Sequence, residues 1–257
     1  AMMGDYLSAQ ARYRLGRKKI KTFEDYIVAN FGRSLGKFNM INYTEKLWGI
    51  PARTIHPDWG RQRIKSLNVP EVLRDWLRSA LVKQNEQLKR SLVHVFYYPE
   101  YGTGLIYETI KQHLESLGHE IKLNSHPVAI RHDQRQIEAV DCLIDGHRTI
   151  TLHPQHLIES IPLTEFIRLL QPAPPAEVWQ AAAQLRHRDQ VYLFVTLNRE
   201  RVTDDQWLYF PDQNIPFGRI SEMKNFSAQM SPLDKTSLFI EFFCFEGDGI
   251  WQMTKDE

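Results

Sequence analysis

One stretch of the sequence combines aromatic rings with guanidinium groups, a pairing suited to flat, negatively charged small molecules. It begins with Tyr43 and Trp48 and continues through Trp59 to Arg61 and Arg63. The rings can stack on a planar substrate while the arginines clamp an anion. The alternative is a corner of the core, with Trp48 packed inside and the arginines on the surface. Composition by itself favours this alternative, because aromatic side chains mostly mark buried core.

Two other patterns suggest chemistry but lack the context that the chemistry needs. Residues 32–36 match the Gly-x-Ser-x-Gly elbow of serine hydrolases, which requires a strand before the serine, whereas here a helix precedes it. His153 and His156 are three residues apart, but Pro154 argues against a shared helical face, and no carboxylate pair stands at ligand spacing. We therefore expect neither a serine nucleophile nor a bound metal.

A third pattern, Gly102-x-Gly104, lies between an expected strand and an expected helix. A glycine turn in that position can approach a phosphate group. Tyr107 occupies the place of the third glycine of a dinucleotide fingerprint, so a simple turn is the better interpretation.

The elements that would position these residues change character along the chain. Thr22 followed by Asp25 resembles a capping box, and Gly32 is a suitable C-cap, which together predict a helix over residues 23–31. A second helix is predicted to begin near Asn68 and Pro70. The first third of the chain is therefore expected to be helical.

From Val93 onward the pattern predicts strands as well as helices. Asp145-Gly146 is a strong hairpin signal, and strand, helix, strand and hairpin together make an α/β unit. A strand-rich layer is expected to follow. The predicted helices span residues 105–117, 164–170 and 175–186, and the predicted strands span residues 93–98, 120–123, 128–132, 136–144, 148–152, 190–197, 207–210, 217–220 and 237–245.

Composition limits the class of protein. The 257 residues carry 32 Lys+Arg and 31 Asp+Glu, a formal charge of +1, which argues against a protein built to neutralise nucleic acid. The two cysteines, Cys142 and Cys244, exclude a disulfide scaffold and make a reducing compartment the expectation. No apolar run approaches the roughly 18 residues of a membrane span. We therefore expect a cytoplasmic protein with no transmembrane segment.

A series of motifs, in order, resembles the FAD-dependent flavin amine oxidase and protoporphyrinogen-oxidase-like superfamily, in the branch near UDP-galactopyranose mutase. The resemblance runs from about Thr22 to Phe245, and it depends on the order of the motifs rather than on any one of them. They are Phe23-Glu24-Asp25-Tyr26, Tyr43-Thr44-Glu45-Lys46-Leu47-Trp48-Gly49, Arg63-Ile64, Tyr98-Pro99-Glu100-Tyr101-Gly102-Thr103-Gly104, Val128-Ala129-Ile130, Ser160-Ile161-Pro162-Leu163, Gln206-Trp207-Leu208-Tyr209-Phe210 and Phe217-Gly218-Arg219-Ile220.

The resemblance implies an α+β fold of mixed α/β character in which FAD and substrate domains are interleaved. Residues 1–92 correspond to the helical part of the substrate domain, 93–163 to a central piece of the FAD-binding domain, and 164–257 to the β-sheet of the substrate domain. No Gly-x-Gly-x-x-Gly turn for the FAD pyrophosphate occurs in the sequence. The chain is therefore expected to be the middle of such a protein, colourless and inactive by itself, and to associate with the remaining FAD-domain segments or into a homo-oligomer.

The resemblance also implies roles for particular residues. Val128 lies on the strand whose main chain contacts the FAD adenine in the family. Tyr43, Trp48 and Arg63 lie where the mutases bind nucleotide and pyrophosphate, and Arg219 is a weaker candidate from the opposing sheet. We expect these four residues to line the cavity for a small-molecule substrate. The implied catalytic residues remain unassigned.

Three functions stay open at this point. The first is the substrate-binding portion of an oxidoreductase whose parent passes a hydride from the substrate to the flavin. The second is a sugar-nucleotide enzyme similar to UDP-galactopyranose mutase, in which reduced flavin is the nucleophile. The third is a non-catalytic binding module derived from the family. Binding measurements with flavin and with a sugar nucleotide discriminate among them.

Overall fold

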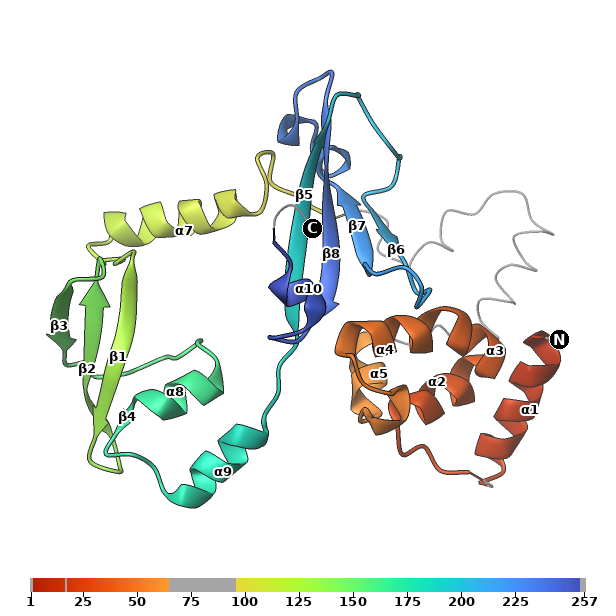
Figure 1. Ribbon diagram of the computed structural model, residues 1–257, viewed down its shortest axis with the longest axis horizontal. Coiled ribbons are helices and arrows are strands. Elements are labelled where there is room, and N and C mark those ends of the chain that lie inside the picture. The colour runs from red at the N-terminus through yellow and green to blue at the C-terminus, as the bar shows by residue number, and fades with distance from the viewer. Residues whose placement is uncertain (1, 17, 65–95, 255–257) are drawn as a thin grey trace. The chain divides into compact units, whose positions relative to one another are not determined.

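A run of helices is followed by mixed helices and strands in the computed structural model, which describes residues 2–16, 18–64 and 96–254 (Figure 1). The fold is of the α+β class, as expected. The described residues group into two compact units, one drawn from residues 1–104 and 188–257 and the other from residues 105–187. The expected helix near Asn68 and Pro70 lies outside the described residues.

The first unit begins with a layer of short helices around α2, Phe23–Phe31. The Thr22 side chain accepts a hydrogen bond from the Asp25 backbone N–H at 3.1 Å, and Gly32 ends the helix with a φ of 77°. Phe23 and Ile27 are fully buried in the core beneath it. The other helices of this layer are α1 (Met2–Arg14), α3 (Arg33–Gly36), the π-helix Lys37–Ile41, α4 (Asn42–Trp48), the 3-10 helix Ala52–Thr54 and α5 (Asp58–Arg63).

The first unit also contains a four-stranded antiparallel sheet in the order β5-β8-β7-β6. Its longest pairing joins β5 to β8 along their whole lengths, from Asp189↔Cys244 to Leu197↔Thr236. The strands are β5 (Asp189–Leu197), β6 (Trp207–Tyr209), β7 (Arg219–Glu222) and β8 (Thr236–Cys244), with 3-10 helices at Met223–Asn225 and Ala228–Met230 and a final helix α10 at Gly249–Gln252.

Two buried charged residues at the end of β7 fix the loops around this sheet. Glu222 accepts hydrogen bonds from the backbone N–H groups of Val202 and Thr203 at 2.9 and 2.8 Å, and from the Thr236 hydroxyl at 2.7 Å. Lys224 donates to four backbone carbonyls, those of Glu200, Pro232, Leu233 and Lys235. Each charge thus binds several backbone groups of the neighbouring loops and ties those loops to the end of β7.

The Glu222 carboxylate makes this part of the fold sensitive to acid. Burial raises its pKa, but the hydrogen bonds from Thr236, Val202 and Thr203 outweigh burial and hold the pKa below its ordinary value of 4.5. A lowered pKa in the folded state contributes stability above pH 4.5, and that contribution is lost as the pH falls through the folded pKa. We expect urea denaturation between pH 3 and pH 6 to show a shallower pH dependence for Glu222→Gln than for the unaltered chain. Equal slopes would contradict this, and Glu246→Gln, at an exposed position, serves as the control.

The second unit contains a four-stranded mixed sheet in the order β3-β2-β1-β4, and α8 packs against β1 of this sheet. The strands β1 and β2 pair antiparallel, and β4 pairs parallel to β1 through Ile130↔Leu170 and Arg131↔Gln171. Asp145 and Gly146, both with positive φ, form the expected turn between β2 and β3. The elements are α7 (Gly104–Ser116), β1 (Ser125–His132), β2 (Ile137–Ile144), β3 (Arg148–Leu152), α8 (Leu163–Leu169), β4 (Leu170–Gln171) and α9 (Ala176–Gln184).

Some expected boundaries differ from those observed. Residues 96–98 and 120–123 were expected in strands, but neither segment is part of a strand. Residues 164–187 fall within the second unit, in which α8 contacts β1 and α9. The two compact units divide at 104/105 and 187/188. No helix in the described ranges has both the length and the hydropathy that a membrane span requires.

Candidate functional site

The helix α4 carries Tyr43 and is bound to the sheet of the first unit through Arg188. The guanidinium of Arg188 donates to the carbonyls of Lys46 and Leu47 at the C-terminus of α4, at 3.3 and 3.1 Å, and to the carbonyl of Phe243 in β8 at 3.1 Å. Carbonyls at a helix C-terminus carry partial negative charge, so a cation there is favourable. Arg188 therefore fixes the distance between α4 and β8.

A lysine on α4 fixes the loop that leads into β7. The Lys46 ammonium donates hydrogen bonds of 2.5 to 3.1 Å to four backbone carbonyls of this loop, and burial lowers its pKa. The loop ends immediately before Arg219. By holding the loop, Lys46 therefore fixes the backbone position from which the Arg219 side chain extends. The four carbonyls belong to Phe210, Asp212, Ile215 and Phe217.

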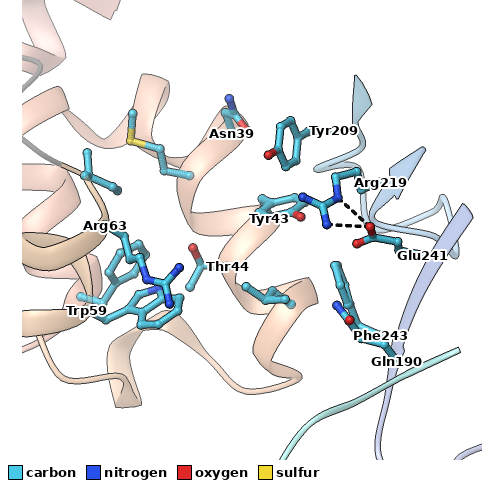
Figure 2. A pocket seen from close by; sticks show the side chains of 14 residues that line it. Asn39, Tyr43, Thr44, Trp59, Arg63, Gln190, Tyr209, Arg219, Glu241 and Phe243 are labelled. Carbon is cyan, nitrogen blue, oxygen red and sulfur yellow. Dashed lines mark hydrogen bonds and ion pairs between the residues drawn. The ribbon is translucent and has the colours of Figure 1, made fainter. Parts of the chain in front are cut away.

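A pocket of about 510 Å³ opens between these helices and the sheet, within the first unit (Figure 2). Its size lies in the usual range for small-molecule sites. Aromatic and polar side chains line it from both sides. The lining includes Asn39, Tyr43, Thr44, Trp59 and Arg63 from the helical layer, and Gln190, Tyr209, Arg219, Glu241 and Phe243 from the sheet.

The register of the sheet places an ion pair in the pocket wall. Arg219 lies opposite Glu241 across β7 and β8, and opposite Tyr209 across β6 and β7. The Nε and Nη2 atoms of Arg219 contact Oε1 of Glu241 at 2.8 and 2.6 Å. The Arg219 guanidinium also lies 5.9 Å from the Tyr209 ring centroid. Burial lowers the pKa of Arg219, but its bonds to Glu241 and Tyr209 outweigh burial and raise it, so Arg219 stays charged.

Tyr43 forms the aromatic side of the same wall. Its ring meets Tyr209 edge-to-face at 5.2 Å and Phe243 at 6.1 Å between centroids. Burial raises the pKa of Tyr43 to about 12, so its hydroxyl is neutral at physiological pH. A neutral phenol can donate to an anion or accept from a hydroxyl.

Arg63 supplies a second guanidinium from α5. It lies over the Trp59 ring at 4.6 Å, a distance typical of a cation–π contact. No acidic side chain of the described residues forms an ion pair with Arg63. Figure 2 shows Arg63 and Arg219 on the two sides of the pocket, with Tyr43 between them.

The structure brings together three of the four residues expected to bind substrate, namely Tyr43, Arg63 and Arg219. Trp48 lies behind the wall, edge-to-face with Trp59 at 5.0 Å, and its indole N–H is buried without a partner in the described part of the chain. Trp48 therefore supports Trp59 rather than lining the pocket. Within the described residues no cluster of side chains has the composition of a metal site.

Val128, the residue expected to contact FAD adenine, lies on β1 in the second unit. It falls at an irregularity in the β1–β2 register and has no partner residue in β2. The strand β4 pairs only with Ile130 and Arg131, so no described strand covers the other edge of β1 at Val128. Its side chain is 44% exposed.

Sequence reasoning missed Glu241, Gln190 and Phe243, which complete the pocket. Glu241 had a detectable signal, since it is a single carboxylate inside the apolar strand of residues 237–245. A charged residue in such a run is rarely buried unless it is paired. Its partner could not be identified without the strand register.

Comparison with known proteins shows the fold of this chain but not its family. No family model matches the sequence. The chain is similar to a crystal structure of reduced UDP-galactopyranose mutase, with a TM-score of 0.72 and 17% identity over 99% of this chain and 52% of that one. It is also similar to an oxidoreductase from Methanosarcina mazei, with a TM-score of 0.57 and 11% identity over 95% and 51%. The chain therefore spans about half the length of the solved structures it matches, and it shares its fold with the matched half of UDP-galactopyranose mutase.

Proposed function

We propose that this chain is the substrate-binding portion of a flavin-dependent enzyme, and that its pocket binds a sugar nucleotide or a similar ring-bearing anion. The observation that carries the proposal is the placement of Arg63 and Arg219 on two sides of one aromatic pocket. Guanidinium groups recognise phosphate and carboxylate, and aromatic rings stack on a planar base. The likeness in fold to UDP-galactopyranose mutase supports the same ligand class.

The charges in the pocket argue against a cationic substrate, such as an amine, and against an apolar one, such as a polyene. An amine would meet two guanidinium groups and a single carboxylate, Glu241, which Arg219 already engages. An apolar ligand would cover Arg63 without offering it an anionic partner, which is costly. An anionic ligand satisfies Arg63 and the remaining N–H groups of Arg219.

Each side chain then has a defined part in binding. Tyr43 and Tyr209 present ring edges and faces to a base, Arg63 and Arg219 hold the anionic group, and Trp59 holds Arg63 in place. The flavin, when bound, supplies a nucleophile if it is reduced or a hydride acceptor if it is oxidised. In this proposal the main chain at Val128 holds the adenine edge of FAD.

A second candidate is the substrate-binding portion of an oxidoreductase whose parent passes a hydride from the substrate to the flavin. The likeness in fold to the Methanosarcina mazei oxidoreductase favours it. The two candidates differ in what a bound substrate does to the flavin. Bleaching of the flavin absorbance by substrate in a flavin-loaded form would support the oxidoreductase, whereas unchanged absorbance with a bound sugar nucleotide would support the mutase-like role.

Binding of UDP-galactose to the unaltered chain, measured by titration calorimetry, tests the proposed ligand class. We expect Arg63→Ala to weaken this binding by about 10- to 100-fold, because a hydrogen bond between charged groups contributes about 1.5–3 kcal/mol. Arg61→Ala is the matched control, since Arg61 lies on the same helix and pairs with Asp58 at the surface. Equal losses for the two variants, or no binding to the unaltered chain, would contradict the proposal.

A further inference from the structure

Glu241 is a buried carboxylate of which only one oxygen accepts hydrogen bonds within the described part of the chain. Its side chain is 6% exposed, and Oε1 accepts both bonds from Arg219. Its Oε2 atom is buried and has no hydrogen-bond partner in the described part of the chain. Glu241 nevertheless belongs to the lining of the pocket, and the dashed lines from Arg219 in Figure 2 end on only one of its two oxygens.

The strand register holds the Glu241 carboxylate in this position. Glu241 lies directly opposite Tyr192 in β5 and Arg219 in β7, so the side chains form one row across the sheet that Tyr209 continues in β6. The titratable groups near the carboxylate are Arg219, Tyr43, Tyr192 and Tyr209. None of these groups donates to Oε2.

An ionised carboxylate oxygen only accepts hydrogen bonds, and leaving it buried without a donor is costly. We propose that Glu241 determines specificity by accepting, at Oε2, a hydrogen bond from a hydroxyl or N–H group that the ligand carries beside its anionic group. The inference rests on the proposed function and extends it to a hydroxyl-bearing anion such as a sugar phosphate. Oε2 is covered in the free protein, so this hydrogen bond requires a neighbouring side chain to move when the ligand binds.

This arrangement separates hydroxyl-bearing anions from bare ones. An anion without a hydroxyl or N–H group that binds near Arg219 also approaches the negative charge of Glu241, and it has no hydrogen-bond donor for Oε2. A ligand with a donor next to its anionic group satisfies Arg219 and Oε2 at once. The pocket therefore admits the second kind of anion in preference to the first.

The substitution Glu241→Gln tests this with two probes that should respond in opposite directions. In the variant the amide oxygen can still accept the hydrogen bonds from Arg219. The amide NH₂ group, a donor, then takes the position of Oε2. UDP-galactose, which carries hydroxyl donors, should bind at least about tenfold more weakly. Sulfate, which carries no proton at pH 7.5, should bind more tightly because a negative charge has been removed. Tryptophan fluorescence reports both titrations, and Glu246→Gln is the exposed control that should change neither.

The outcomes separate this inference from the proposed function. If the unaltered chain does not bind UDP-galactose, the proposed function fails and the inference fails with it. If it binds but both probes shift in the same direction in Glu241→Gln, Glu241 acts only through Arg219 and the inference alone is wrong. A comparison on the unaltered chain needs no variant: galactose 1-phosphate should bind more tightly than methyl phosphate, and equal affinities would overturn the inference.

Discussion

Replacing Arg219 by methionine is expected to lower the free energy of unfolding by about 2–3 kcal/mol. The substitution removes the partner of the Glu241 carboxylate, whose side chain is 6% exposed, and leaves a buried charge unpaired. Breaking a buried ion pair in this way typically costs about 3–5 kcal/mol. The Arg219 side chain is 35% exposed, so water screens part of the interaction and the expected loss is smaller. Urea denaturation at pH 7 measures it.

Two further variants show whether the lost stability comes from the unpaired charge. The double variant Arg219→Met with Glu241→Leu should recover most of the stability, because neither charge remains. It should not recover binding of the anionic ligand, which needs the guanidinium. Arg168→Met removes an exposed pair with Glu165 and should change stability by less than about 0.5 kcal/mol. A loss for Arg219→Met no larger than for Arg168→Met would show that Glu241 does not depend on its partner.

Replacing Lys46 by methionine is expected to cost about 2–4 kcal/mol and to loosen the loop before Arg219. Four carbonyls accept from one ammonium in the folded chain, and methionine offers them no donor. Hydrogen bonds to a charged group contribute about 1.5–3 kcal/mol each, although four acceptors share three protons here. Hydrogen exchange should show faster exchange for amides in residues 210–217, and denaturation should show the loss of stability.

The control for this variant is Lys37→Met, an exposed lysine of the same helical layer. It should leave both the stability and the exchange of the 210–217 loop unchanged. If Lys46→Met also leaves them unchanged, the loop is held by other contacts. Ligand affinity should fall together with loop protection, because the loop leads directly into Arg219.

Much of the local structure could be predicted from the sequence, because its causes lie within a few residues. The helix α2 begins at a side-chain cap from Thr22 and ends at Gly32, which has a positive φ. The turn at Asp145-Gly146 likewise depends on two residues that adopt a positive φ. Neither cause depends on the rest of the fold. The aromatic residue Tyr98 illustrates the limit. Strand propensity predicted a strand around it, but none of the strands in the described part of the chain pairs with this segment.

The sequence by itself determined the α+β class and the residue types of the site, including Tyr43, Arg63 and Arg219. Only the tertiary structure decided that these three share one pocket, that Trp48 supports Trp59 from behind, and that Glu241 pairs with Arg219. The physical reason is that caps, turns and periodicity act between neighbours in sequence. Strand register and the burial of a charge depend on segments that are far apart in the chain, and no local pattern encodes them.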